Sequence, residues 1–286
     1  MSKNTIKTYT LLAFLGGLLV LIGSFFGRGG AFVGLALALA FVGGTYWFSG
    51  TIAIKSARAV PVTEQQMPEY YRIVRELTAA ASMPMPKLYV TPDLQPNAFA
   101  TGRNPDHAAV AVTQGILNIL DWRELRGVLA HEISHVGNRD ILIGSVAAAV
   151  AMGITFVARM AMWGAMLGGG GGDDDDGGMN PLAFVVFALL APIAAMVLQF
   201  ALSRSREYEA DRSGARLLHD GESLASALGK LDRAARAVPM QVDPVQAGKF
   251  IVNPLTGRRA RFANLFSTHP PVEDRIARLR AGDWRS

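Results

Sequence analysis

The chain has 286 residues and a formal net charge of +5, contains no cysteine, and is half hydrophobic. Its mean hydropathy of +0.25 is too high for an ordinary soluble domain of this size, so part of the chain is expected to lie in lipid. The absence of cysteine excludes disulfides and thiolate metal ligands, and no basic-aromatic pattern indicates nucleic-acid binding.

Two segments at the start of the chain carry no charged residue. They are residues 9–27 and 29–54, on either side of Arg28, and each is close to or above the roughly 20 residues that a helix needs to cross a bilayer. A cleaved signal peptide does not fit, because the second segment follows at once without a clean cleavage site. Residues 1–54 are therefore predicted to form a transmembrane hairpin.

The polar segment 55–140 comes next and begins the expected soluble domain. In chain order, we expect a helix over Glu64–Ala80, a strand over Lys87–Thr91, and a hairpin formed by Asn97–Thr101 and His107–Thr113. The turn of this hairpin is expected at Gly102-Arg103-Asn104-Pro105.

The following helix is predicted to begin at Trp122, because Asp121 and Glu124 have the spacing of a capping box. Apolar residues then recur at helical spacing and predict a buried stripe of Leu125, Val128, Leu129, Ile133 and Val136.

This helix carries the most informative motif of the chain. His131 and His135 are one turn apart and share a face, so both imidazoles can reach one metal ion. Glu132 lies about 100° round the helix from His131, near enough to hold a water at that ion. The spacing is that of a zinc peptidase, and its alternative is a chance placing of two histidines around a glutamate.

A second apolar pair is expected within residues 141–202. The segments 141–167 and 178–202 are long enough to cross a bilayer, with Arg159 the only charge in the first and Pro192 expected to kink the second. The loop between them is rich in glycine, contains Asp173–Asp176, and is interpreted as a solvated turn.

Basic residues predict the orientation of these spans. They precede the first and third spans and follow the second and fourth, at Lys3, Lys7, Lys55, Arg58, Arg139, Arg204 and Arg206. The aspartate loop contains none. By the positive-inside rule, both termini and the polar segments are expected to be cytoplasmic. Residues 55–140 and 203–286 would then pack as one domain that the second hairpin interrupts.

The segment 203–286 is expected to complete the metal site, because a catalytic zinc uses three protein ligands and one open position. Helices are predicted over Ser203–Leu218 and Glu222–Ala237, followed by a short helix after Pro270-Pro271. A metzincin pattern fails, since Asn138 and Ile141 stand where a glycine and a third histidine would be needed.

The third ligand is therefore expected to be a carboxylate on another helix. Glu207 and Asp211 are one turn apart on one face, whereas Glu209 points elsewhere. Glu207 could bind the metal, and Asp211 could accept the second N–H of a ligand histidine and fix its tautomer. From spacing alone, a solvated helix face is about as well supported.

Four stretches carry a resemblance to a known family: residues 131–135 with Asn138 and Asp140 behind them, Ser203–Asp211, Ser267–Ile276 and Pro96–Gly102. With the paired spans in this order, the chain resembles the HtpX-type membrane zinc metalloproteases, which are related to the type I prenyl-dependent CAAX proteases. The resemblance implies a mainly α, four-span membrane protein. Its cytoplasmic domain would be zincin-type, gluzincin-like, and would carry a small β-hairpin or sheet.

The resemblance also implies roles for site residues. His131, His135 and Glu207 would hold one Zn²⁺ per chain, and Glu132 would be the catalytic base. Two further residues would lie at the active site and could stabilise the oxyanion, His269 and Arg275. By its position alone, His269 would more often be a core histidine at the start of a helix. The substrate backbone would be bound by Asn97, Ala98, Phe99 and Ala100. Support behind the ligands would come from Asp211, Asn138 and Asp140.

The expected protein is a multi-pass zinc endopeptidase of the bacterial inner membrane. The resemblance alone implies that it would cut misfolded or damaged membrane proteins on the cytoplasmic side in envelope quality control. Its partners would be these substrates and the lipid bilayer, with no nucleic acid. One alternative is a CAAX-type protease of prenylated tails, although four spans do not easily enclose a large chamber. The other is a non-catalytic scaffold or chaperone with a structural zinc, although structural sites are usually closed by four ligands.

Overall fold

The structure is a computed structural model, and it describes residues 27–144, 146, 204–237 and 270–285 together with scattered positions between 6 and 24. Most of the first predicted span, the greater part of the second predicted pair with its aspartate loop, and His269 lie outside the described residues.

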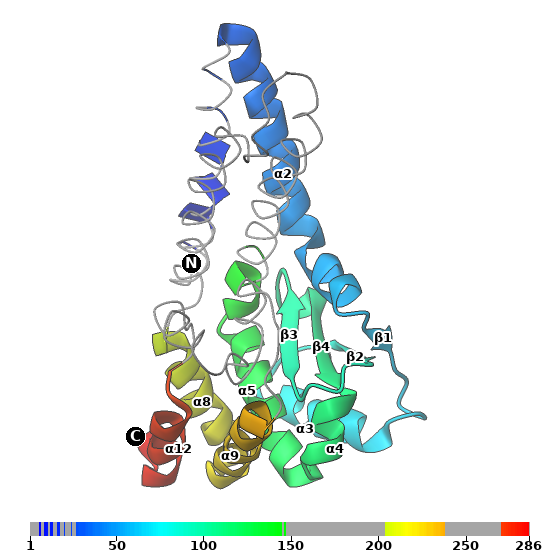
Figure 1. The fold of residues 1–286 in the computed structure, drawn as a ribbon, viewed down its shortest axis with the longest axis vertical. Coiled ribbons are helices and arrows are strands. Elements are labelled where there is room, and N and C mark those ends of the chain that lie inside the picture. Colours follow the sequence, from blue (N-terminus) through cyan, green and yellow to red (C-terminus); the bar gives the residue numbers. More distant parts are fainter. Residues whose placement is uncertain are drawn as a thin grey trace, which may run out of the picture.

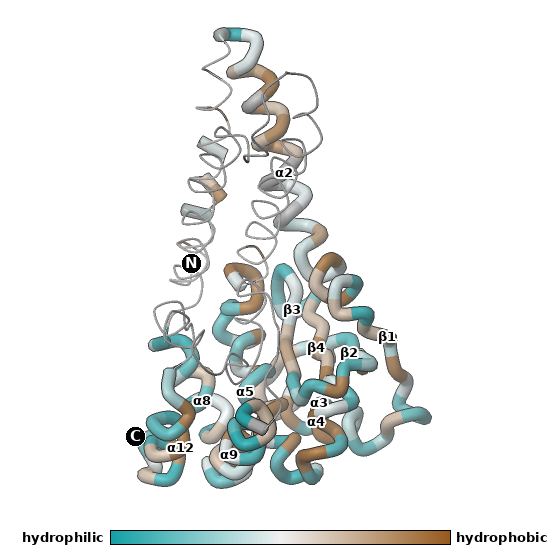
Figure 2. Tube along the Cα trace, in the orientation of Figure 1, coloured by the Kyte–Doolittle hydropathy of each residue, from teal (hydrophilic) through white to brown (hydrophobic). Residues whose placement is uncertain are grey.

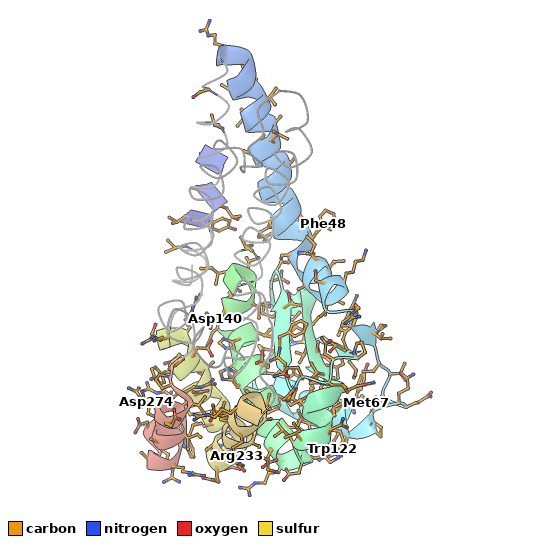
Figure 3. All side chains as sticks on the ribbon, in the orientation of Figure 1. Phe48, Met67, Trp122, Asp140, Arg233 and Asp274 are labelled. Atoms are coloured by element: carbon orange, nitrogen blue, oxygen red, sulfur yellow. The ribbon has the colours of Figure 1, made fainter. Side chains whose placement is uncertain are left out.

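The longest described helix, α2 (Gly27–Ser56), extends away from the sheet and from most of the other described helices (Figure 1). At 1.5 Å per residue its length is about 45 Å. Hydrophobic colour runs along much of it (Figure 2), and Phe48, labelled in Figure 3, is one of its exposed apolar residues. None of the helices that the structure describes is both long and apolar enough to cross a membrane. The four-span arrangement therefore stays a prediction.

A small sheet lies beside the base of α2. Its strands are β1 (Val60–Pro61), β2 (Lys87–Thr91), β3 (Ala98–Gly102) and β4 (Ala108–Thr113). They lie in the order β1-β2-β4-β3, with β2 parallel to β4 and β3 antiparallel to β4. The structure confirms the predicted strand and hairpin. Sequence analysis did not predict β1 or the parallel pairing of β2 with β4.

The remaining described α-helices closely follow the predicted ones. They are α3 (Pro68–Ala80), α4 (Gln114–Ile119), α5 (Trp122–Gly137), α8 (Arg204–Leu218), α9 (Glu222–Ala237) and α12 (Val272–Ala281). The short α4 was not predicted. The first helix was expected to begin at Glu64, and instead it begins at Pro68. Proline suits this place because its missing N–H would have no partner in the first turn.

The helix α5 lies at the centre of the domain and contacts α3, α8, α9 and β3. Its predicted capping box is present: Asp121 Oδ1 accepts from Glu124 N at 2.9 Å, and Glu124 Oε2 accepts from Asp121 N at 3.1 Å. Glu124 also accepts from Ser226 Oγ at 2.7 Å and Lys230 Nζ at 2.6 Å, which fixes the start of α5 to α9. All five residues of the predicted apolar stripe are buried.

Two glycines allow the helices to approach α5 closely. A Cβ atom on Gly127 of α5 would lie 2.5 Å from Leu224 N of α9. A Cβ atom on Gly214 of α8 would lie 3.0 Å from His131 N and from Ala130 C of α5. Contacts below 3.0 Å are not tolerated and those near it are tight, so both positions favour glycine. The second approach holds α8 directly against the turn of α5 that carries His131.

Candidate metal centre and active site

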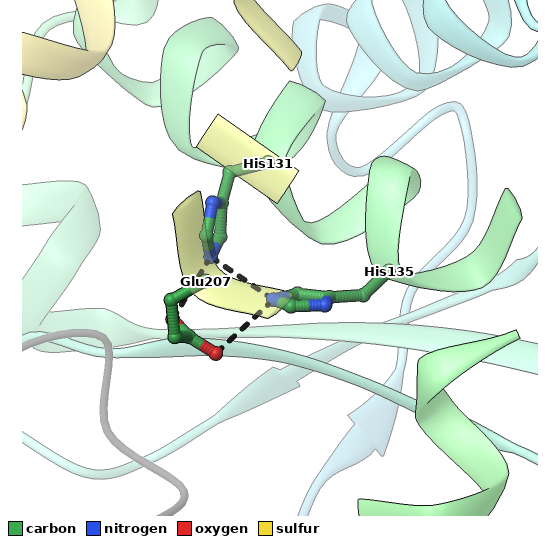
Figure 4. Close-up of side chains that lie close together, drawn as sticks. All are labelled: His131, His135 and Glu207. Atoms are coloured by element: carbon green, nitrogen blue, oxygen red, sulfur yellow. Dashed lines mark hydrogen bonds and ion pairs between the residues drawn. The ribbon is translucent and has the colours of Figure 1, made fainter. Parts of the chain in front are cut away.

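Three side chains from two helices converge on one point (Figure 4). His131 Nε2 and His135 Nε2 are 3.2 Å apart, and Glu207 places one carboxylate oxygen 3.7 Å from the first and the other 3.6 Å from the second. A tetrahedral ion with bonds of about 2.0–2.2 Å separates its ligand atoms by about 3.3–3.6 Å. The three residues thus fit one metal ion, and among the described residues they are the group that could hold it.

A carboxylate lies behind each of the two histidines. Asp211 Oδ1 is 2.9 Å from His131 Nδ1, and Asp140 Oδ2 is 3.1 Å from His135 Nδ1. Carboxylates in this position favour the tautomer that carries its proton on Nδ1, which leaves Nε2 free to bind a metal. Asp140, labelled in Figure 3, lies just beyond α5. Asn138 is the C-cap residue of the same helix.

Arg275 lies behind the metal centre and is fully buried. Its Nε donates to Asp211 Oδ2 at 2.8 Å, and one terminal nitrogen donates to Asp211 Oδ1 at 2.7 Å. The other terminal nitrogen is 4.0 Å from Glu207 Oε2. We expected Arg275 to meet the oxyanion of the substrate, whereas its contacts favour a role in holding Asp211.

The charges around the site favour a bound cation. Burial acts to lower the pKa of His135, but Asp140, Glu207 and Glu132 outweigh it and raise the pKa to about 9. Burial acts to raise the pKa of Asp211, but Arg275 and then His131 outweigh it and hold the pKa at about 2. An excess of buried carboxylate charge around two histidines is the environment that a divalent cation would neutralise.

Glu132 is buried beside the proposed ligands, and one of its oxygens is fixed by the backbone. Ala100 N of β3 donates to Glu132 Oε2 at 2.9 Å. Burial raises the pKa of Glu132; His131 and His135 act against this rise, and Glu207 adds to it. A raised pKa suits a carboxylate that must accept a proton near neutral pH. Sequence reasoning missed the contact with Ala100, because a backbone amide leaves no signal in the residue pattern.

The strand β3 contains three of the four residues expected to bind substrate, and Asn97 directly precedes it. Asn97 O accepts from Thr113 N at 2.9 Å, so Asn97 pairs with the β4 side. Because backbone groups alternate in direction along an antiparallel strand, Ala98 and Ala100 direct theirs away from β4. Among the described strands none lies on that side of β3. Within the described part of the chain, β3 therefore has no strand partner on the side where Ala100 meets Glu132.

Known proteins are similar to this chain over nearly its whole length. The profile of peptidase family M48 matches residues 64–283. A Protease HtpX homolog of Pelotomaculum thermopropionicum is 50% identical over 97% of this chain and 99% of its own length. One of Syntrophobacter fumaroxidans is 53% identical over 96% of this chain and 98% of its own length.

A solved structure shares the fold. It is the crystal structure of S. mikatae Ste24p, with a TM-score of 0.54 and 19% sequence identity. The match covers 96% of this chain but 65% of the solved chain, so this protein spans about two thirds of that length.

Removal of any one of the three converging side chains should remove the metal. We expect His131→Ala, His135→Ala and Glu207→Ala to purify without bound zinc, because each leaves only two protein ligands. Elemental analysis of the purified proteins measures this. Glu209→Ala is the matched control, since Glu209 is exposed and lies 3.9 Å from Arg212. Zinc retained by Glu207→Ala and lost by Glu209→Ala would show that the third ligand has been misassigned.

Replacement of Arg275 should destabilise the fold. Arg275→Met leaves Asp211 buried without its counter-ion, and we expect the free energy of unfolding to fall by about 3–5 kcal/mol. The double variant Arg275→Met/Asp211→Asn should recover part of this loss, because the uncompensated charge is gone. Arg278→Met on the same helix removes an exposed arginine that stacks on Tyr208 and should cost at most about 1 kcal/mol.

Thermal unfolding in detergent, with zinc content measured alongside, distinguishes the two roles of Arg275. If Arg275→Met left the melting temperature unchanged and lowered kcat, the result would favour a role of Arg275 in stabilising the oxyanion.

Proposed function

This chain belongs to peptidase family M48, and from that premise we propose that it is a zinc endopeptidase with Glu132 as its general base. His131, His135 and Glu207 are the proposed ligands. The observation that carries the proposal is the convergence of these three side chains within 3.7 Å of one another beside a buried Glu132. A structural zinc is usually closed by four ligands, whereas this set leaves one position for a reacting group.

The residues around the site support a hydrolytic reaction. When bound, zinc would supply a Lewis acid that makes water acidic and polarises the scissile carbonyl. Glu132 accepts the proton of the attacking water through the oxygen that Ala100 does not hold, and it then gives this proton to the leaving nitrogen. His269 is the proposed donor to the oxyanion, on the resemblance alone. Asp211, Asp140 and Asn138 are proposed to support the ligands.

The substrate is proposed to bind as an added strand on β3. The outward backbone groups of Ala98 and Ala100 would pair with an extended peptide, while Asn97 and Phe99 border this edge. Ala100 N–H is engaged by Glu132, so its carbonyl and the groups of Ala98 are those available to the peptide. Edge pairing reads the backbone more than the side chains, so the proposed peptidase has broad specificity.

We place the reaction at the cytoplasmic face of the bacterial inner membrane. The four charge-free segments, the basic residues at their ends and the exposed apolar side chains of α2 support this location. The proposed division is a first hairpin (1–54), a split peptidase domain (55–140 and 203–286) and a second hairpin (141–202). Misfolded or damaged membrane proteins are the proposed substrates, and envelope quality control is the proposed role.

Glu132→Gln tests the proposed mechanism. The amide cannot accept a proton but leaves all three ligands in place, so zinc content should stay near wild type while proteolysis falls by about 10²-fold to 10⁴-fold. The assay follows cleavage of labelled casein by protein purified in detergent without metal and then supplied with zinc. A prenylated peptide tested in parallel examines the alternative substrate class. Activity of Glu132→Gln within a few-fold of wild type would rule out the mechanism.

The proposed topology can be tested with single cysteines, because the chain has none of its own. In intact spheroplasts, an impermeant thiol reagent should label a cysteine at Asp174 and should not label one at Ser56 or Ser286. The expected difference arises because only the aspartate loop would face outward. The same reagent after membrane permeabilisation is the control for reactivity. The opposite labelling pattern would place the peptidase domain outside.

A further inference from the structure

The helix α2 closely approaches the turn of the β3–β4 hairpin at Gly50. A Cβ atom on Gly50 of α2 would lie 3.2 Å from Gly102 Cα and 3.4 Å from Gly102 N. Gly102 has φ of +136°, and a Cβ atom there would lie 2.3 Å from His107 O, so no other residue fits the turn. The backbones of α2 and the hairpin therefore meet with no side chain between them.

A second contact joins the same two elements. The guanidinium of Arg103, the residue after Gly102, lies 4.5 Å from the centre of the Trp47 ring. Trp47 is one helical turn before Gly50 and so lies on the same side of α2. The stacking of a cation on an indole is attractive and directional. Together, Gly50 and Trp47 hold the turn Gly102-Arg103 in place, and we call these four residues the hairpin clamp.

The hairpin clamp lies at one end of the strand that holds Glu132. Ala100 is two residues before Gly102, a separation of about 7 Å along a strand. Its N–H donates to Glu132 Oε2 at 2.9 Å. Because β3 pairs with β4 as a regular ladder between these points, a displacement of the turn moves Ala100 with it. The contacts thus run from α2 through the turn and along β3 to the carboxylate of Glu132.

We propose that Gly50 and Trp47 of α2 are positioning residues for peptide hydrolysis, which set the place of β3 and, through Ala100, the orientation of Glu132. The inference rests on the proposed function of Glu132 as the base. A helix that extends away from the domain, with exposed apolar side chains, thereby controls the geometry of the reacting carboxylate. Reacting groups tolerate displacements of only about 0.5 Å, so a small shift of the hairpin is sufficient to lower the rate.

Substitutions of graded size at Gly50 test this inference. In Gly50→Ala the hairpin must move by a few tenths of an ångström, and kcat should fall about 3-fold to 10-fold. In Gly50→Leu the displacement is larger, and kcat should fall by about 10²-fold. The fall in kcat should exceed any rise in KM for casein, because the base is displaced while the strand edge remains. Zinc content and melting temperature should match the wild type.

Gly44 offers the matched control on the same helix. Within the described part of the chain, a Cβ atom there meets nothing within 4 Å, and it lies about 120° round the helix from Gly50. Gly44→Ala and Gly44→Leu gain the same helix propensity as the Gly50 variants, so only the contact with the hairpin differs. Both controls should keep the wild-type kcat.

The stacking contact gives an independent test. Trp47→Ala and Arg103→Ala should each lower kcat, and the double variant should lose no more than the larger single loss, since both remove one interaction. Trp47→Phe and Arg103→Lys keep an aromatic face or a cation and should restore most of the rate.

Three results would overturn the inference. They are wild-type kcat in both Gly50 variants, loss of activity that only accompanies loss of zinc or of thermal stability, and additive losses in the Trp47 and Arg103 pair. If the Glu132→Gln variant cleaved casein as well as the wild type, the proposed function of Glu132 would be refuted. The inference would then fail with it.

Discussion

Arg275 of α12 and Asp211 of α8 form a bidentate ion pair in which both side chains are buried, and Asp211 in turn lies 2.9 Å from His131 of α5. The contacts from Arg275 to Asp211 and from Asp211 to His131 therefore join three helices that are far apart in the sequence. An uncompensated buried charge costs several kcal/mol, so none of these groups can move without the others. The positions of His131 and Glu207 depend on this arrangement, because α8 carries both Asp211 and Glu207.

The same site gathers more buried carboxylate than cationic charge. Asp140, Asp211, Glu132 and Glu207 surround two imidazoles. Two buried arginines lie near these four carboxylates: Arg275 pairs with Asp211, and Arg206 lies near Asp140 and Glu207. Such a cluster is costly in a protein interior unless a cation completes it. The same carboxylates raise the pKa of His135, because they stabilise its positively charged form. A divalent ion between the proposed ligands would complete the cluster and would leave the proton of each imidazole on Nδ1.

The edge strand β3 is the part of the sheet that contributes to the site. The strand β3 is the outermost described strand, and its amide at Ala100 holds Glu132 on the side that faces away from β4. The base and the proposed substrate edge thus share one strand, so their relative placement is built into the fold. The helix α2, which touches this hairpin at Gly102, connects the edge to the apolar part of the chain.

Local sequence signals determined much of this protein. The capping box at Asp121 and the apolar stripe fixed α5, and the helical spacing placed His131 and His135 on one face, because these features depend only on near neighbours. The start of α3 differed by one turn, since Pro68 was a stronger signal than Glu64. The sequence motif alone left Glu207 undecided between a ligand and a solvated face.

Only the tertiary structure decided what depends on contacts distant in the sequence. The close approach at Gly214 brought Glu207 to the two histidines, and Arg275 was directed to Asp211, because the position of α12 is set by packing and not by local pattern. The parallel pairing of β2 with β4 and the bond from Ala100 to Glu132 are of the same kind. Backbone groups are alike in every residue, so their partners follow from the fold and leave no mark in the sequence.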